Sequence, residues 1–184
     1  MIQPWKKTGS RQIGDFRIFS LRADTRVSPR TGAAHEVFVL DCVNWVNIIA
    51  VTPDDQLVMV EQYRFGSETV ELEIPGGMMD KHETDPVATA MRELREEIGY
   101  EGEKARLLGD VLPNPAIQGN VCHTVIVENC RIKHAMQFDP AEDIVTRLVP
   151  VAEIPKLVAA GKIRHSLVVV ALYYYDLLRR GIKA

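Results

Sequence analysis

Glu93, Glu96 and Glu97 are spaced so that a helix would bring their three carboxylates to one face. Like charges held this close repel one another unless something neutralises them. Hard divalent cations such as Mg²⁺ take oxygen ligands and would neutralise such a cluster. The spacing therefore predicts a metal–carboxylate site. The alternative is an ordinary solvated Glu/Arg face on a surface helix.

The helix that must carry these glutamates is bounded at both ends by residues that favour helix termini. Asp85 is a good N-cap, and Pro86 suits the first helical position, where a missing N–H costs nothing. Gly99 can adopt the left-handed conformation that ends a helix. Apolar residues recur between them at helical spacing, namely Val87, Ala90, Met91, Leu94 and Ile98. We expect this stripe to anchor the helix and leave its acidic face free.

The stretch 76–100 resembles the signature of the Nudix hydrolases. That signature reads Gly, five residues, Glu, seven residues, then Arg-Glu-apolar-x-Glu-Glu-x-Gly-apolar. Gly77, Glu83 and the run RELREEIGY at 92–100 supply it, with eight residues in place of seven after Glu83. The helical register is intact, so we expect the extra residue in the loop that precedes the helix.

The resemblance extends to the ADP-ribose and nucleoside-diphosphate-sugar pyrophosphatases. Similar runs stand at 61–64 (EQYR), 71–77 (ELEIPGG), 139–144 (DPAEDI) and 163–165 (IRH), and Pro115 follows the signature by fifteen residues. Residues 116–120 (AIQGN) depart from the pattern of many ADP-ribose enzymes. The resemblance implies hydrolysis of the pyrophosphate bond of ADP-ribose or an ADP-, UDP- or GDP-sugar to a nucleoside monophosphate and a sugar phosphate. The implied cofactor is Mg²⁺, with Mn²⁺ as a possible substitute.

The residues assigned to metal binding are Glu93, Glu97, Glu96 and a backbone carbonyl of Gly76 or Gly77. Among them Glu96 is a further ligand or a support. Glu142, in the late acidic loop, resembles the glutamate that serves as general base in such enzymes. A catalytic role for Glu96 or Glu97 of the signature is the alternative, as is an ordinary polar loop at Glu142.

Substrate contacts are assigned to Arg64, Glu71, Glu73 and Pro115. The guanidinium of Arg64 would offer a forked contact to a phosphate. Glu71 and Glu73 share one face of a strand, and edge-strand charges that discourage aggregation are the alternative for them. Structural roles in the signature fall to Gly76, Glu83, Arg92 and Gly99, and the resemblance implies that Arg92 holds the loop through Glu83.

The tryptophans have two possible roles, and the histidines are expected to have a structural one. Trp5 and Trp45 would either stack on a base or pack in a core or dimer interface, and packing is the commoner role. His123 and His165 are expected to be hydrogen-bonded packing residues and not metal ligands.

Composition excludes several classes of protein. The chain has 184 residues, a formal charge of −3 and a pI near 6.0, and no basic block predicts a nucleic-acid partner. Cys42, Cys122 and Cys130 have no CxxC spacing and are odd in number, so they are expected to be buried thiols. Without a signal peptide or a membrane-length apolar run, the sequence predicts a cytoplasmic protein with no membrane contact.

The elements that position these residues are predominantly strands. Strands are expected at 16–22, 36–40, 45–52, 57–63, 70–74, 105–112, 121–128 and 146–149, with 45–52 and 57–63 paired around a turn at 53–55. Later helices are expected at about 151–160 and 166–180. The fold class is therefore α+β. The resemblance implies a Nudix-type α/β/α sandwich around a mixed β-sheet.

The chain is expected to form an N-terminal antiparallel β extension over 1–40 and a Nudix hydrolase domain over 41–184. The extension would serve homodimerisation and possible substrate contacts. Two other functions compete with nucleotide-sugar hydrolysis. One is action on dinucleoside polyphosphates or capped RNA, and the other is a non-catalytic nucleotide-sugar-binding regulatory module.

Overall fold

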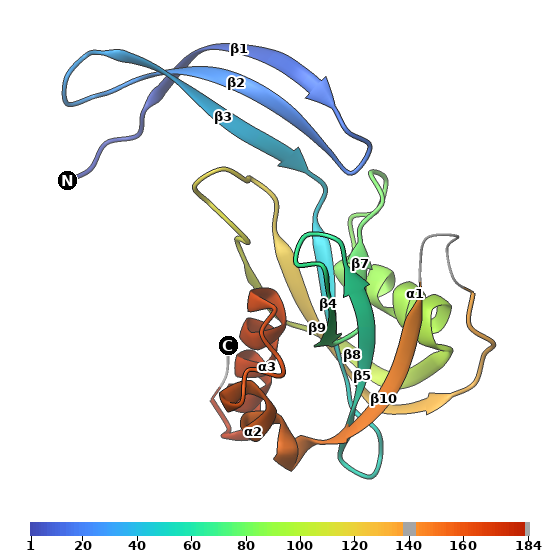
Figure 1. Cartoon of the computed structure of the whole chain (residues 1–184). Helices are drawn as coiled ribbons and strands as arrows, with labels where there is room; N and C mark the ends of the chain where they lie inside the picture. The colour runs from blue at the N-terminus through green and yellow to red at the C-terminus, as the bar shows by residue number, and fades with distance from the viewer. Residues whose placement is uncertain (138–142, 183–184) are drawn as a thin grey trace. The chain divides into compact units, whose positions relative to one another are not determined.

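The computed structural model describes residues 1–137 and 143–182 and divides the chain into two compact units (Figure 1). One unit comprises Met1–Asn44 with Leu112–Val121, and the other comprises Trp45–Val111 with Cys122–Ala184. No helix within the described residues is long and apolar enough to cross a bilayer.

The N-terminal unit is a three-stranded antiparallel meander of β1 (Lys6–Asp15), β2 (Phe19–Val27) and β3 (Ala34–Cys42). Between β2 and β3 the Ser28 N–H donates to the Ala33 carbonyl at 2.9 Å, and Gly32 has a φ of 71°. The strands predicted at 16–22 and 36–40 fall largely within β2 and β3. The sequence prediction missed β1, because its residues KKTGSRQIGD are mostly polar and lack apolar alternation.

The proline-rich segment 112–121 is held against the end of β3 within the same unit. The Leu40 N–H donates to the Ile117 carbonyl at 2.8 Å, and the Val121 N–H donates to Asn44 Oδ1 at 3.0 Å. The Asn120 side chain also donates to the Val43 carbonyl at 3.0 Å. Pro115 lies in a turn of this segment.

The larger unit contains two sheets. A mixed four-stranded sheet has the order β7 (Gly76–Met78), β4 (Trp45–Ala50), β9 (Cys122–Ile132) and β8 (Tyr100–Val111), with β4 and β9 parallel. An antiparallel three-stranded sheet has the order β10 (Ile144–Pro150), β5 (Gln56–Arg64) and β6 (Thr69–Glu73). The mixed sheet confirms that part of the predicted fold class.

The predicted pairing of 45–52 with 57–63 is wrong. These segments form β4 and β5, which belong to different sheets and meet at an isolated bridge between Val51 and Leu57. The backbone of Val51 is already committed to β9, because its N–H donates to Val127 and its carbonyl accepts from Cys130. The two strands therefore diverge immediately beyond their connecting turn.

Helices cover the two faces of the mixed sheet (Figure 1). Leu94 of α1 (Pro86–Ile98) packs in one core cluster with Val46 and Ile48 of β4. Ile49 of the same strand points the other way and packs in a second cluster with Leu172 of α3 (Ser166–Arg179). This alternation along β4 is the period-2 pattern of a strand buried on both faces. The expected α/β/α sandwich is confirmed.

The predicted termini of α1 are confirmed. Asp85 Oδ1 accepts the Val87 N–H at 2.9 Å, and Gly99 has a φ of 70° with its N–H bonded to the Arg95 carbonyl. A short helix α2 (Ile154–Ala159) follows the 3-10 turn Val151–Glu153, within the predicted range 151–160.

Loss of the Asp85 cap is expected to destabilise the chain modestly. Asp85→Ala leaves an orphan N–H at the start of α1 and should lower the free energy of unfolding by about 1 kcal/mol. For a chain of this size that corresponds to a fall in Tm of about 2–4 °C. Asp85→Asn, which keeps the acceptor, and Thr84→Ala on the exposed neighbour should both stay near the wild-type Tm. An unchanged Tm for Asp85→Ala would contradict the capping role.

Candidate active site

The glycine pair of the signature lies directly against α1. Pairing of β7 with β4 sets Gly76 opposite Asn47 and Gly77 opposite Val46. A Cβ built on Gly77 would lie 2.5 and 2.7 Å from the two carboxylate oxygens of Glu93. A larger residue would push the Glu93 carboxylate away, so glycine lets the backbone approach it. The Gly76 N–H also donates to Glu97 Oε2 at 3.3 Å.

The three glutamates do not share one environment. The side chain of Glu93 is 12% exposed and Glu97 is 6% exposed, and both contact the glycine pair. Glu96 is 37% exposed and pairs with Arg92 Nη1 at 3.0 Å. It lines a separate cavity of about 440 Å³ together with Arg95, Lys133, His134, Ala135 and Gln137. The structure thus brings Glu93 and Glu97 together with Gly76 and Gly77, and sets Glu96 to the side.

Arg92 holds the loop before α1 through Glu83, as predicted. Its Nε and Nη2 donate to the two Glu83 oxygens at 3.1 and 3.2 Å. Its Nη2 also lies 2.9 Å from Glu93 Oε1. The Arg92 guanidinium is the main cause that lowers the pKa of Glu83 to about 2. The Glu83–Arg92 pair therefore forms with the extra residue present before the helix.

The donor set at the glycine pair fits a hard divalent cation. The carboxylates of buried Glu97 and partly buried Glu93 and the adjacent backbone carbonyls are all oxygen donors, and glycine leaves the backbone bare beside Glu93. Within residues 1–137 and 143–182, no three His, Cys, Asp or Glu side chains already form a ligand set. Mg²⁺ is ordinarily held by one or two carboxylates with waters and substrate phosphates, so Glu93 and Glu97 suffice for such a site.

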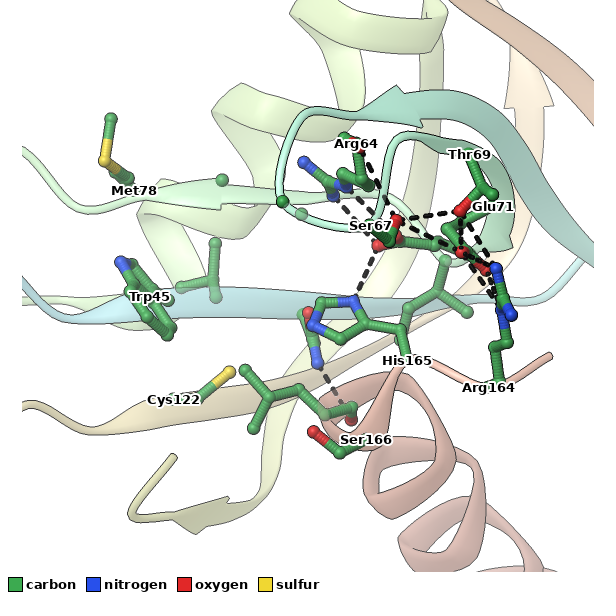
Figure 2. A pocket seen from close by; sticks show the side chains of 18 residues that line it. Trp45, Arg64, Ser67, Thr69, Glu71, Met78, Cys122, Arg164, His165 and Ser166 are labelled. Atoms are coloured by element: carbon green, nitrogen blue, oxygen red, sulfur yellow. Dashed lines mark hydrogen bonds and ion pairs between the residues drawn. The ribbon is translucent and has the colours of Figure 1, made fainter. Parts of the chain in front are cut away.

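A cavity of about 800 Å³ adjoins the glycine pair (Figure 2). Figure 2 shows Trp45, Met78 and Cys122 along one part of it, and a cluster of charged and hydroxyl side chains along the other. The polar residues labelled there are Arg64, Ser67, Thr69, Glu71, Arg164, His165 and Ser166. Burial raises the pKa of the Cys122 thiol to about 12, so this thiol is an apolar neighbour and not a nucleophile.

Glu73 occupies the Nε/Nη2 edge of the Arg64 guanidinium. Arg64 Nε and Nη2 each donate to one Glu73 oxygen at 2.9 Å, and His165 Nδ1 lies 2.8 Å from Glu73 Oε2. Burial of Glu73, which is 2% exposed, opposes its ionisation. Hydrogen bonds from His165 and Arg64 outweigh that cost and lower its pKa to about 2.

Glu71 forms a second buried carboxylate–guanidinium pair. Arg164 Nε donates to both Glu71 oxygens at 3.1 and 3.0 Å, and Thr69 and Ser67 add hydroxyl contacts to Oε1. The Arg164 guanidinium is the main cause that lowers the pKa of Glu71 to about 2. Both Glu71 and Glu73 are buried, so the alternative of solvated edge-strand charges is wrong for them.

The structure also places the histidines, tryptophans and cysteines that the sequence analysis singled out. His165 is hydrogen-bonded as expected, whereas His123 Nδ1 is buried without a hydrogen-bond partner in the part of the chain that the structure describes. Trp45 lines the cavity, and Trp5 packs on His35 in the N-terminal unit with ring centroids 5.4 Å apart. Cys122 and Cys130 are buried as predicted, and Cys42 is half-buried. Glu142 lies outside the described residues.

Sequence reasoning missed the partners of the β6 carboxylates. Ser67, Thr69 and Arg164 join Glu71 in the cavity wall. A usable signal was present: adjacent Arg164 and His165 stand just before an apolar helix, and two acidic residues alternate on one strand. Charges at such positions need buried partners of opposite sign.

Comparison with known proteins supports the signature. The NUDIX domain matches residues 44–168. The methanol dehydrogenase activator of Bacillus methanolicus is 31% identical over 173 residues, which cover 94% of this chain and 92% of that protein. The ADP-ribose pyrophosphatase of Bacillus subtilis (strain 168) is 29% identical with the same coverage. The crystal structure of an ADP compounds hydrolase, 19% identical, has a TM-score of 0.86 over 98% of this chain and 97% of its own. These matches confirm the predicted family, and the chain belongs to the NUDIX domain family.

Proposed function

We propose that this protein is a metal-dependent pyrophosphohydrolase that cleaves a nucleoside diphosphate sugar to a nucleoside monophosphate and a sugar phosphate. The observation that carries the proposal is the contact of Glu93 and Glu97 with the glycine pair at the edge of the 800 Å³ cavity. Relatives that match 83% or more of the chain include two named ADP-ribose pyrophosphatase. A module that only bound ligand would have no need of buried carboxylates beside bare glycine backbone.

Glu93 and Glu97 would hold the metal, with the Gly77 carbonyl as a further ligand and Glu96 as a ligand or support. The ion proposed is Mg²⁺, with Mn²⁺ as a substitute. When bound, it would neutralise phosphate charge and lower the pKa of coordinated water.

Arg64 would bind a phosphate through the edge of its guanidinium that Glu73 leaves open. Glu73 takes the Nε hydrogen and one Nη2 hydrogen, which leaves both Nη1 hydrogens and the second Nη2 hydrogen for a ligand in the cavity. Glu73 fixes the plane of the guanidinium and so reduces the ordering cost of that contact. We therefore keep the predicted forked contact, through Nη1 and Nη2, and we move Glu73 from substrate contact to support of Arg64.

The test is a substrate panel at fixed Mg²⁺. Purified protein is incubated with ADP-ribose, ADP-glucose, UDP-glucose, GDP-mannose, a diadenosine polyphosphate and capped RNA, and products are separated by chromatography. Nucleoside monophosphate and sugar phosphate from one or more of the first four are expected. Preferential cleavage of the dinucleotide or the cap would favour the alternative substrates. Tight binding without turnover would favour the regulatory module.

Glu142 is the proposed general base, by resemblance to the glutamate of the late acidic loop. Glu142→Gln is expected to lower kcat about 10²-fold, because positioned bases contribute roughly 10²–10⁴-fold. Mg²⁺ affinity, measured by calorimetry, should stay nearly unchanged because the proposed ligands are elsewhere. The matched control is Asp143→Asn on the neighbouring residue. Full turnover in Glu142→Gln would remove it from this role.

A homodimer is proposed for the N-terminal unit. Its large apolar side chains Ile13, Phe16, Ile18 and Phe38 are exposed in the single chain. Apolar surface of this kind often marks an association site. Sedimentation should show a species of twice 20.7 kDa, and a single 20.7 kDa species would contradict the proposal.

The three free thiols suit a reducing compartment, so we place the protein in the cytoplasm.

A further inference from the structure

Four side chains form a continuous polar cluster on the cavity wall: Ser67, Thr69, Glu71 and Arg164 (Figure 2). The Thr69 hydroxyl donates to Glu71 Oε1 at 2.5 Å, and Arg164 Nη2 donates to the same oxygen at 2.6 Å. Arg164 Nη2 also reaches the Thr69 hydroxyl at 2.9 Å. These contacts join β6 to the residue before His165, across 93 residues of sequence. The cluster is therefore a fixed part of the wall.

The contacts within the cluster leave some of its hydrogen-bond donor and acceptor positions available to a ligand. Among the described residues, Glu71 Oε2 receives one donor, from Arg164 Nε at 3.0 Å, although a carboxylate oxygen can accept two. The contacts of Arg164 with the described residues use Nε and Nη2 and leave its Nη1 amino group for a ligand. The Arg164 side chain is also 57% exposed, so this group can reach the cavity. A carboxylate acceptor and a guanidinium donor thus stand side by side at the cavity surface.

The charge of the cluster selects the type of ligand. Glu71 and Arg164 cancel, so the cluster attracts neither a phosphate nor a cation, and the buried carboxylate would repel a phosphate placed on Oε2. A hydroxyl group both donates and accepts hydrogen bonds. Two neighbouring hydroxyls match the adjacent acceptor and donor of Glu71 and Arg164. This chemistry fits a sugar better than a phosphate.

The other part of the cavity has the opposite character. Trp45, Met78 and Cys122 present an aromatic ring, a thioether and a thiol, and no charged side chain among them (Figure 2). An aromatic and sulfur-rich surface suits a flat base. Gly76, Gly77 and Arg64 line the same cavity and supply the groups already proposed for the metal and the phosphates.

We propose that Ser67, Thr69, Glu71 and Arg164 form the subsite that binds the vicinal hydroxyls of the distal sugar, the sugar on the far side of the pyrophosphate from the nucleoside. This inference rests on the proposed function and deepens it. This subsite fixes the orientation of the substrate along the cavity, with its base by Trp45 and its distal sugar by Arg164.

The test compares two esters of ADP with wild type and variants. ADP-ribose carries the distal hydroxyls, and the pentyl ester of ADP lacks them but keeps the same pyrophosphate. The measured quantity is the ratio of kcat/KM for ADP-ribose to kcat/KM for the pentyl ester. In Glu71→Gln this ratio should fall about tenfold, because a lost hydrogen bond to a charged group discriminates by at least that factor. Ser67→Ala and Thr69→Val should lower it about threefold each, as losses of neutral hydrogen bonds.

Two controls separate recognition from support of the fold. Arg147→Ala removes another arginine–glutamate pair, with Glu61 at 2.8 Å, which does not line the cavity. The ratio should remain at the wild-type value in that variant. Thr69→Ser, which keeps the hydroxyl, should restore most of the ratio lost in Thr69→Val. Because Glu71 is buried and its variant can misfold, Ser67→Ala on an exposed residue gives an independent reading.

Each outcome decides between the two proposals. If folded variants lose activity equally on both esters, the cluster is a structural connection and the subsite is wrong. If the wild type hydrolyses both esters with equal kcat/KM, the distal hydroxyls are not read and the inference fails alone. If the wild type hydrolyses neither ester, the subsite for the distal sugar of ADP-ribose is wrong, and if it also hydrolyses no nucleotide sugar of the substrate panel, the proposed function fails as well.

Discussion

Glu97→Gln is expected to lower kcat/KM for a nucleoside diphosphate sugar about 10³-fold without unfolding the protein. Glu97 is 6% exposed and accepts the Gly76 N–H at 3.3 Å. Glutamine has nearly the same volume and keeps an oxygen acceptor for that N–H, but it loses the negative charge. Loss of a metal-binding carboxylate costs several kcal/mol of transition-state stabilisation, and about 4 kcal/mol is 10³-fold in rate.

The measurement joins kinetics with a Mg²⁺ titration and a thermal melt. Weakened Mg²⁺ binding is expected in parallel with the loss of rate, with a Tm close to wild type. Glu103→Gln, an exposed glutamate on β8, is the matched control and should keep full activity. Glu96→Gln distinguishes a ligand from a support, because a ligand would lose Mg²⁺ affinity as Glu97 does. Wild-type activity in a well-folded Glu97→Gln protein would refute the metal assignment.

The parts of the fold that the sequence predicted well are those encoded by near neighbours. Asp85, Pro86 and Gly99 act within one turn of the helix ends, so α1 was predicted with its observed termini. The pairing of β4 could not be read in the same way. Its backbone partner is β9, with Trp45 beside Cys122, and nothing in the local pattern distinguishes that strand from β5. Strand β1 has polar residues throughout and is defined by its hydrogen bonds to β2.

In the site, too, contacts between near neighbours in sequence were predicted and contacts between distant residues were not. The approach of Glu93 and Glu97 to the glycines follows from helical spacing and from the small size of glycine. The partners of Glu71 and Glu73 lie 93 and 92 residues away, at Arg164 and His165. Sequence shows that a buried charge needs a partner but does not say which one, because the partner is set by where the segment before α3 meets β6. The sequence likewise does not show that Glu73 takes the Nε/Nη2 edge of Arg64.

Arg92→Ala is expected to lower the free energy of unfolding by about 2–4 kcal/mol at pH 7. One guanidinium contacts three carboxylates, those of Glu83, Glu93 and Glu96, at 2.9–3.2 Å. Removing it leaves partly buried negative charges without their partner, which is among the more costly single changes in a protein. The loop before α1 also loses its attachment to the helix. Urea denaturation at pH 7 measures the change.

The same variant has a pH signature. The pKa of Glu83 is about 2 in the folded protein, chiefly because of Arg92, and lies near 4.5 without such a partner. A depressed folded pKa contributes stability that is present above pH 4.5 and is lost as the pH falls towards 2. The difference between wild type and Arg92→Ala should therefore be largest near pH 7 and shrink between pH 4.5 and 2.

Two matched variants show whether this effect comes from the forked contact. Arg92→Lys keeps the charge and loses the fork, so it should recover part of the stability at pH 7 but not all of it. Arg95→Ala removes the next arginine on α1, which is exposed, and should change the free energy of unfolding by less than about 0.5 kcal/mol. A loss in Arg92→Ala that stays constant from pH 7 to pH 2.5 would mean that packing of the side chain, and not its charge, holds the loop to the helix.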